Sequence, residues 1–115
     1  AWNDVDSSES LAMGCLVARK DFLESNPAAI KNFLKEYKDS IKATEDLEKV
    51  APLTVKYDIL PSDKIAKLSI PNCNLVYIDG KDMMLKANNY FKVLFESNPV
   101  SIGGQMPNED LFFVQ

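Results

Sequence analysis

The sequence predicts an α/β chain that is mainly helical and contains one buried strand. Residues 11–18 form an apolar run without alternation, which is typical of a strand buried on both faces. Most other apolar residues recur at every third or fourth position, which is the spacing of amphipathic helices. Because 46% of the 115 residues are hydrophobic, the chain can fill the core of one compact unit.

Helices are expected after the apolar run. A short helical turn is expected around Asp21, and Asn26 followed by Pro27 is typical of an N-cap and first helical position. These two residues begin a long helix, whose charged residues are interpreted as its solvent-exposed face. The apolar stripe of this helix comprises Ile30, Phe33, Leu34, Tyr37 and Ile41.

Two shorter helices are expected next. One covers residues 45–57, where Pro52 should bend or divide it because proline has no backbone N–H to donate. The other begins after Pro61 and ends at Pro71. The residues after Pro71 are predicted to be an irregular turn, and residues 75–78 a short strand or an extended connection.

The last long helix is expected over residues 80–97, with Asp79 as its cap and Asn98-Pro99 at its end. Its inner face should comprise Met83, Met84, Ala87, Tyr90, Phe91 and Leu94. Residues 111–114 form an apolar C-terminal segment, which is predicted to be a short strand or a docked turn.

The amino-acid composition argues against two classes of function, nucleic-acid binding and catalysis. The formal net charge of −4, with thirteen basic residues scattered among seventeen acids, argues against nucleic acid as a partner. The chain has no histidine, so it lacks the commonest general base and the usual zinc ligand. We therefore predict no catalytic residue, no metal site, no cofactor and no enzymatic activity.

The cysteine in the apolar run raises the question of a lipid anchor. Leu11-Ala12-Met13-Gly14-Cys15 is similar to the end of a lipoprotein signal, but the ten residues before Leu11 carry three acids and no Lys or Arg. Cys15 is also followed directly by further apolar chain. We therefore predict that Cys15 is a buried, unmodified strand residue, and that Cys15 and Cys73 are free thiols.

A strand buried on both faces needs neighbours on both edges, because its backbone groups otherwise lack hydrogen-bond partners. Only residues 75–78 and 111–114 are available as partners, and neither segment is long. The sequence thus predicts that this chain is part of something larger, whose sheet is completed by residues outside it.

The order of these features resembles that of a known family. The segment MGCLVARKDFLESNPAAIKNFLKEYKDSI, residues 13–41, resembles solute-binding proteins of bacterial ABC transporters, of the nitrate/sulfonate/taurine and thiamine-precursor type. The segments VKYDILPSDKIAKLSIPNCNLVYIDG and KDMMLKANNYFKVLFESNPVSIGGQMPNEDLFF look like the closing segments of that family. The resemblance covers nearly the whole chain, from Trp2 to Phe113.

The resemblance implies a type II periplasmic-binding-protein-like fold, in which two α/β lobes hold a ligand in the cleft between them. Residues 1–10 would be an irregular lead-in from the missing lobe, and residues 11–115 would be the C-terminal portion of lobe 1, with residues 11–18 as the hinge-return strand. The chain would then be a fragment, proteolytic or engineered, or would have its other piece in a separate chain.

The implied function is capture of a small molecule between the lobes, a shift to the closed state, and delivery to a membrane permease. The implied partners are the ligand, the ABC permease and the remainder of the two-lobed protein, with a strand-swapped homo-oligomer as another form of the fragment. The implied location is extracytoplasmic, with lipid anchoring through an upstream cysteine outside this chain.

Five residues are the candidates for contact with a ligand. Met13 and Gly14 lie at the start of the predicted hinge strand, where glycine would allow close backbone approach. Asn72, Cys73 and Asn74 form the irregular turn, and the two asparagine amides offer both donors and acceptors. The structural alternatives are that Gly14 serves packing and that the asparagines serve turn formation.

Two other functions remain open. The first is an enzyme of the thiamine-pyrimidine-synthase type, which shares the implied fold but whose chemistry is associated with histidine. The second is a free-standing helical interaction module. The unpaired strand argues against this second alternative, because an autonomous module would not leave such a strand without neighbours.

Overall fold

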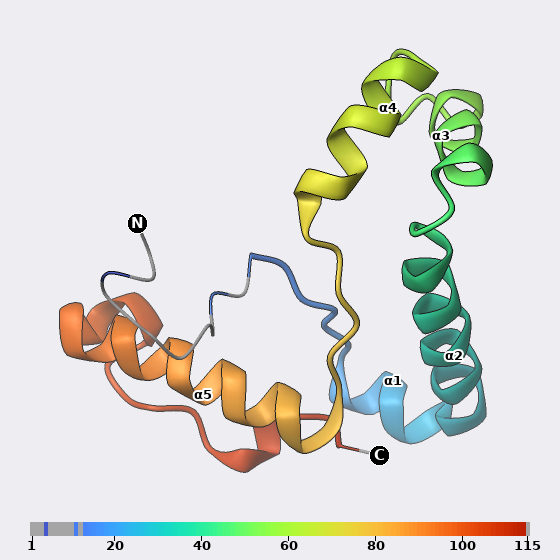
Figure 1. Ribbon diagram of the computed structural model, residues 1–115. Coiled ribbons are helices and arrows are strands. Elements are labelled where there is room, and N and C mark those ends of the chain that lie inside the picture. The colour runs from blue at the N-terminus through green and yellow to red at the C-terminus, as the bar shows by residue number, and fades with distance from the viewer. Residues whose placement is uncertain (1–3, 5–10, 12, 115) are drawn as a thin grey trace. The chain divides into compact units, whose positions relative to one another are not determined.

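The computed structural model describes residues 4, 11 and 13–114, and the chain divides into two compact units (Figure 1). One unit comprises Ala18–Tyr77, and the other comprises Ala1–Val17 together with Ile78–Gln115. The first unit is therefore inserted into the sequence of the second. Most of the lead-in predicted over residues 1–10 lies outside the described residues.

The predicted α/β class is wrong, because the described residues form helices and turns and no strand. Residues 13–18, predicted to be a buried strand, are irregular and exposed, with Val17 87% exposed. Cys15 is exposed rather than buried, and both cysteines are free. A strand needs partner strands to satisfy its backbone, and residues 75–78 are also irregular. An apolar run alone therefore does not determine a strand.

The first unit begins with α1 (Lys20–Ser25) and α2 (Pro27–Ala43). Asn26 occupies the N-cap position of α2 and Pro27 its first turn, so the predicted helix start is confirmed. The Asn26 side chain makes no capping bond, however. Its Nδ2 instead donates to the Phe22 carbonyl oxygen at 3.1 Å, at the end of α1.

Helices α3 (Leu47–Lys56) and α4 (Asp63–Ser69) pack against each other in the same unit (Figure 1). Ala51 on α3 and Ala66 on α4 are both 0% exposed, so two small side chains form the buried centre of this hairpin. Pro52 lies inside α3 without dividing it. The 3-10 turn η2 (Ile70–Cys73) follows α4 and contains the proline predicted to end that helix.

The second unit contains α5 (Gly80–Ser97), so the bounds predicted for the last long helix are confirmed. The six residues predicted for its inner face are half-buried. Asp79 stands at the N-cap, but its side chain makes no capping hydrogen bond. Gly80 adopts a φ of +60°, a conformation that glycine tolerates without strain.

Two short 3-10 turns complete this unit. They are η3 (Pro99–Ile102) and η4 (Glu109–Leu111). The Asn98 side chain accepts a hydrogen bond from the Val100 N–H at 3.2 Å and so caps η3 directly after α5 ends. The apolar C-terminal segment is therefore a turn followed by irregular chain over the described residues, and not a strand.

Candidate functional site

The predicted turn residues Asn72, Cys73 and Asn74 lie together at the end of η2, and all three are exposed. Asn72 Nδ2 donates to the Leu68 carbonyl oxygen at 2.8 Å. Cys73 Sγ lies 3.3 Å from the Ser69 carbonyl oxygen, to which it donates. The last carbonyls of a helix have no partner within the helix, so these two side chains satisfy the end of α4.

Asn74 ends the turn in the left-handed conformation, with φ +49° and ψ +47°. Asparagine is one of the few residues other than glycine that adopts this conformation readily. Its Nδ2 lies 3.5 Å from the Asn72 carbonyl oxygen. The local role of the three residues is thus turn formation, which was the structural alternative to ligand contact.

The other two predicted ligand residues, Met13 and Gly14, belong to the other unit. Met13 is 89% exposed, and a Cβ placed on Gly14 would meet no atom within 4 Å. Packing within the described chain therefore does not require glycine at position 14. The structure brings Asn72, Cys73 and Asn74 together in one turn, and it describes Met13 and Gly14 as neighbours in irregular chain.

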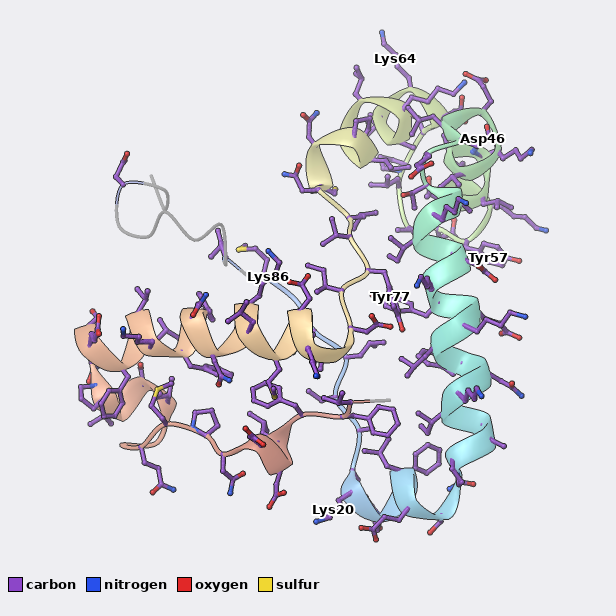
Figure 2. All side chains as sticks on the ribbon, turned by 60° about the horizontal axis from the view of Figure 1, so that its bottom comes forward. Lys20, Asp46, Tyr57, Lys64, Tyr77 and Lys86 are labelled. Atoms are coloured by element: carbon purple, nitrogen blue, oxygen red, sulfur yellow. The ribbon has the colours of Figure 1, made fainter. Side chains whose placement is uncertain are left out.

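An aromatic cluster on α2 was not singled out from the sequence. Tyr77 reaches α2 from the irregular chain after η2, with its ring centroid 5.9 Å from that of Tyr37 in an edge-on arrangement (Figure 2). Phe33 stacks on Tyr37 with centroids 6.0 Å apart, and the Lys38 ammonium lies 5.3 Å from the Tyr77 centroid. The signal in the sequence was a tyrosine in the apolar stripe of α2 and a second one in residues 75–78.

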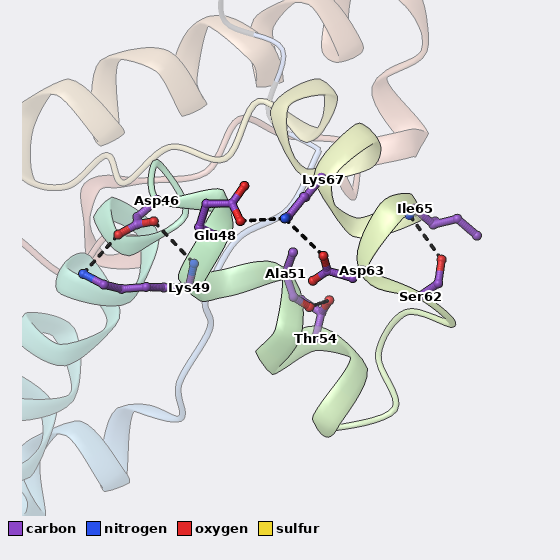
Figure 3. A network of polar contacts seen from close by, with 9 residues as sticks. All are labelled: Asp46, Glu48, Lys49, Ala51, Thr54, Ser62, Asp63, Ile65 and Lys67. Carbon is purple, nitrogen blue, oxygen red and sulfur yellow. Dashed lines mark hydrogen bonds and ion pairs between the residues drawn. The ribbon is translucent and has the colours of Figure 1, made fainter.

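A polar network joins α3 to α4 (Figure 3). Lys67 Nζ lies 2.7 Å from Glu48 Oε2 and 3.2 Å from Asp63 Oδ2. The hydrogen bond that Lys67 donates to Glu48, and then the one that it donates to Asp63, raise the pKa of Lys67 above its ordinary value. The Glu48 and Lys67 contact spans nineteen residues of sequence, so no local pattern predicted it.

One atom of this network is unsatisfied. Asp63 Oδ1 is buried and finds no hydrogen-bond partner among the described residues. The opposite oxygen of the same carboxylate is the one that contacts Lys67. Asp63 is also the first residue of α4, where a negative charge is stabilised by the helix dipole. The arrangement is that of a structural ion pair at a helix start.

At the start of α3, Asp46 Oδ1 accepts a hydrogen bond from the Lys49 N–H at 3.4 Å and caps the helix. The Lys49 ammonium lies 3.0 Å from Asp46 Oδ2, and its hydrogen bond lowers the pKa of Asp46. Figure 3 shows both contacts. Together with the Lys67 pairs, these contacts hold the ends of α3 and α4 in the hairpin.

The second unit contains an open cavity of about 440 Å³. All its lining residues come from one stretch of chain: Gln105, Met106, Pro107, Asn108, Asp110 and Leu111. A binding cavity normally draws polar groups from several elements that converge on one place. This cavity has one charged side chain and no converging elements, so its geometry does not define a binding site.

Other kinds of site are not seen in the described part of the chain. Residues 4, 11 and 13–114 contain no group of three or more His, Cys, Asp or Glu side chains arranged to hold a metal ion. Across the same residues, no helix combines the length and the apolar character needed to span a membrane.

The chain was compared with known proteins at three levels. Neither models of protein families, nor curated proteins, nor solved structures gave a match.

Proposed function

We propose that this chain is part of the solute-binding component of an ABC importer, which captures a small molecule outside the cytoplasm and delivers it to a membrane permease. The resemblance of residues 13–41, 55–80 and 81–113 to that group supports the proposal. The positions of α2, after Asn26, and of α5, as the last long helix, are consistent with this resemblance. The proposal does not rest on the α/β fold, which the structure corrects.

The observation that carries the proposal is the exposure of large apolar side chains on the helices and directly after them. In the Ala18–Tyr77 unit, Phe22 is 50% exposed, Tyr57 65% and Leu68 64%. Full burial of one such side chain contributes roughly 1.5–3 kcal/mol. Surfaces of this kind are suited to contact with further protein, so we assign the chain a packing and binding role and no catalysis.

Two separate groups are the candidates for contact with the solute: Met13 and Gly14 in one unit, and Asn72, Cys73 and Asn74 in the other. All five are exposed, and the two asparagine amides offer donors and acceptors beyond the contacts they make within the turn. A small polar or anionic solute is recognised through such groups and needs no metal or cofactor. The identity of the solute depends on the groups that complete the site.

The gene that encodes this chain provides the test. We expect its reading frame to carry a signal peptide, and adjacent genes to encode a permease and an ATPase. The product of the whole reading frame should then show a saturable thermal shift with one class among nitrate, sulfonates and thiamine precursors. A reading frame without a signal peptide or transporter neighbours, and no shift with any of these compounds, would contradict the proposal.

A second candidate function is a helical interaction module. It is favoured by the helical character of the described residues and by the α3–α4 hairpin, which has its own buried alanines and ion pairs. The thermal-shift experiment distinguishes the two functions. An interaction module is expected to bind a polypeptide and to show no thermal shift with any of the small molecules.

A further inference from the structure

Helix α2 carries a row of four lysines, which we call the lysine stripe: Lys31, Lys35, Lys38 and Lys42. The spacing of four, three and four residues places them on one side of the helix, within a sector of about 60° at roughly 100° per residue. All four side chains belong to exposed residues. Because a helix rises about 1.5 Å per residue, the stripe is about 16 Å long.

The lysine stripe stands out in an acidic chain. Four lysines against Glu36 and Asp39 leave α2 with a net charge of +2, whereas the whole chain carries −4. Across the described residues, Lys31, Lys35 and Lys42 form no ion pair, although lysines on α3, α4 and α5 do. The positive charge of α2 is therefore concentrated on one side and is not neutralised within the described chain.

The apolar stripe of α2 runs alongside the lysine stripe. Ile30, Leu34, Tyr37 and Ile41 lie about 100° around the helix from the lysines and are half-buried, while Phe33 is 52% exposed. One side chain of the same unit contacts residues of both stripes. Tyr77 contacts the ring of Tyr37 on the apolar stripe and lies under the ammonium of Lys38 on the lysine stripe.

We infer that α2 binds an acidic amphipathic polypeptide segment along the border between its two stripes. Apolar residues of this partner pack beside Ile30 and Leu34, and its carboxylates face Lys31 and Lys35, one to two turns before the place where Tyr77 contacts the helix. Because the lysine stripe is positively charged, the partner residues that face it carry negative charge. A partner helix with carboxylates at the same spacing of four, three and four residues matches the stripe.

The charge distribution of α2 favours a polypeptide over an anionic membrane. Asp39 lies on the side of the helix opposite the apolar stripe, and Glu36 lies beside the border of that stripe away from the lysines, so only one border of the stripe is basic. A helix that lies on an anionic membrane has a polar face rich in Lys and Arg, and acids there would be repelled. A polypeptide can place carboxylates along the one basic border and leave the acids in solvent. This inference is independent of the proposed transport function.

The test uses a fluorescein-labelled helical peptide with leucines on one face and glutamates at the matching spacing. A second peptide has glutamines in place of the glutamates. We expect fluorescence anisotropy to show binding of the glutamate peptide to the 115-residue chain about tenfold tighter than that of the glutamine peptide. Raising the salt from about 20 to about 150 mM should weaken the binding of the glutamate peptide, because salt screens exposed charges.

Two matched variants locate the contact. The variant K31Q/K35Q/K38Q/K42Q should lose about tenfold in affinity for the glutamate peptide. The control variant K56Q/K64Q/K81Q/K86Q has the same net charge and should bind within about twofold of the unsubstituted chain. Equal losses in both variants would show that only net charge matters and would overturn the inference, as would no loss in the first.

A charge reversal covers the case in which the first variant loses its helix, which circular dichroism would reveal. The variant K31E/K35E/K38E/K42E should bind a peptide with lysines at the matching positions in preference to the glutamate peptide. Binding of the unsubstituted chain to phosphatidylserine vesicles, with no binding of the glutamate peptide, would overturn the inference in favour of a membrane.

Discussion

Ser62 and Asp46 each end an irregular segment and begin a helix. Ser62 Oγ accepts a hydrogen bond from the Ile65 N–H at 3.3 Å, and Asp46 does the same for Lys49. The first N–H groups of a helix have no partner within it, so each side chain satisfies a donor that would otherwise be left to water. At this scale, the stability of a helix end depends on single polar atoms.

Replacing Ser62 with alanine should destabilise α4. An N-cap serine contributes about 1 kcal/mol, so amide exchange in α4 should accelerate roughly fivefold in Ser62→Ala. Hydrogen exchange followed by mass spectrometry over residues 63–69 measures this directly. Ser40→Ala, on the exposed side of α2, is the control and should leave exchange in α4 unchanged. Equal exchange in the two variants would show that Ser62 does not cap the helix.

The ion pairs of Lys67 should make stability depend on pH in the alkaline range. Its pKa is raised in the folded chain, chiefly by Glu48 and then by Asp63, above the ordinary value of 10.5. A raised pKa means that the stabilising contribution is complete below about pH 10.5 and is lost as the pH rises through the folded-state pKa. Acidification below neutrality therefore does not remove the contribution until the carboxylates are protonated.

The comparison of the unsubstituted chain with Lys67→Met isolates this effect. The difference in their free energies of unfolding, from urea titrations followed by circular dichroism, should be constant between about pH 7 and 9 and should shrink above about pH 10.5. Lys64→Met removes an exposed lysine that forms no ion pair within the described chain, and it is the control for the loss of one charge. If the difference in the free energy of unfolding between the unsubstituted chain and Lys67→Met increased with pH, the prediction would be wrong.

The turn residues show what residue-level reasoning could predict of the candidate site. The amides of Asn72 and Asn74 can bind a ligand, and they can equally serve turn formation. The structure uses one donor of each in the turn, and Cys73 caps the same helix end. The composition of the turn indicated that its side chains can form hydrogen bonds. Whether they bond to a ligand or to the chain itself depends on the position of the last α4 carbonyl groups.

Helix α3 and helix α4 meet at two alanines, which allow their backbones to approach closely. Ala51 and Ala66 are the residues in the described chain with no exposed surface at all. A larger side chain at either position would have to displace the facing helix or leave its preferred rotamer. The hairpin is therefore the element whose stability responds most directly to side-chain volume.

Ala51→Leu and Ala66→Leu should each lower the stability of the hairpin by about 1–3 kcal/mol. Thermal unfolding followed by circular dichroism at 222 nm should show this as a lower midpoint or a loss of helical signal. Ala29→Leu adds the same volume on the exposed side of α2 and is expected to change little. A stability of Ala66→Leu equal to that of Ala29→Leu would contradict close packing at this position.

Helices could be predicted from this sequence and strands could not, for a physical reason. The bounds of α5 and the start of α2 follow from periodicity and capping residues, which act within a few positions of the chain. A strand in residues 11–18 depended on distant partners that satisfy its backbone, and the described residues supply none. The ion pair between Glu48 and Lys67 is non-local in the same way, and it was also not predicted.

Over the described residues, many large apolar side chains are exposed, and few residues are fully buried. In the Ala18–Tyr77 unit, Tyr57, Ile59 and Leu68 are each more than 60% exposed, while the fully buried residues are two alanines. Full burial of one large side chain contributes roughly 1.5–3 kcal/mol, so burying the part of these three that is still exposed would contribute about 3–6 kcal/mol. The entire stability of a small domain is about 5–15 kcal/mol. Contact with another polypeptide is one way in which the chain would gain this energy.

The purified 115-residue chain should therefore associate with itself in the absence of another partner. Size-exclusion chromatography with light scattering is expected to show an average mass that increases with concentration, and the dye ANS should fluoresce on binding the exposed apolar side chains. The double variant Tyr57→Ser and Leu68→Ser removes two of these side chains and should reduce both signals, whereas Tyr90→Ser, in the other unit, serves as a comparison for general effects on folding. A cooperative monomer at all concentrations that binds no ANS would show that the chain buries these side chains without any partner. The assignment of the chain to a larger assembly would then lose its principal support.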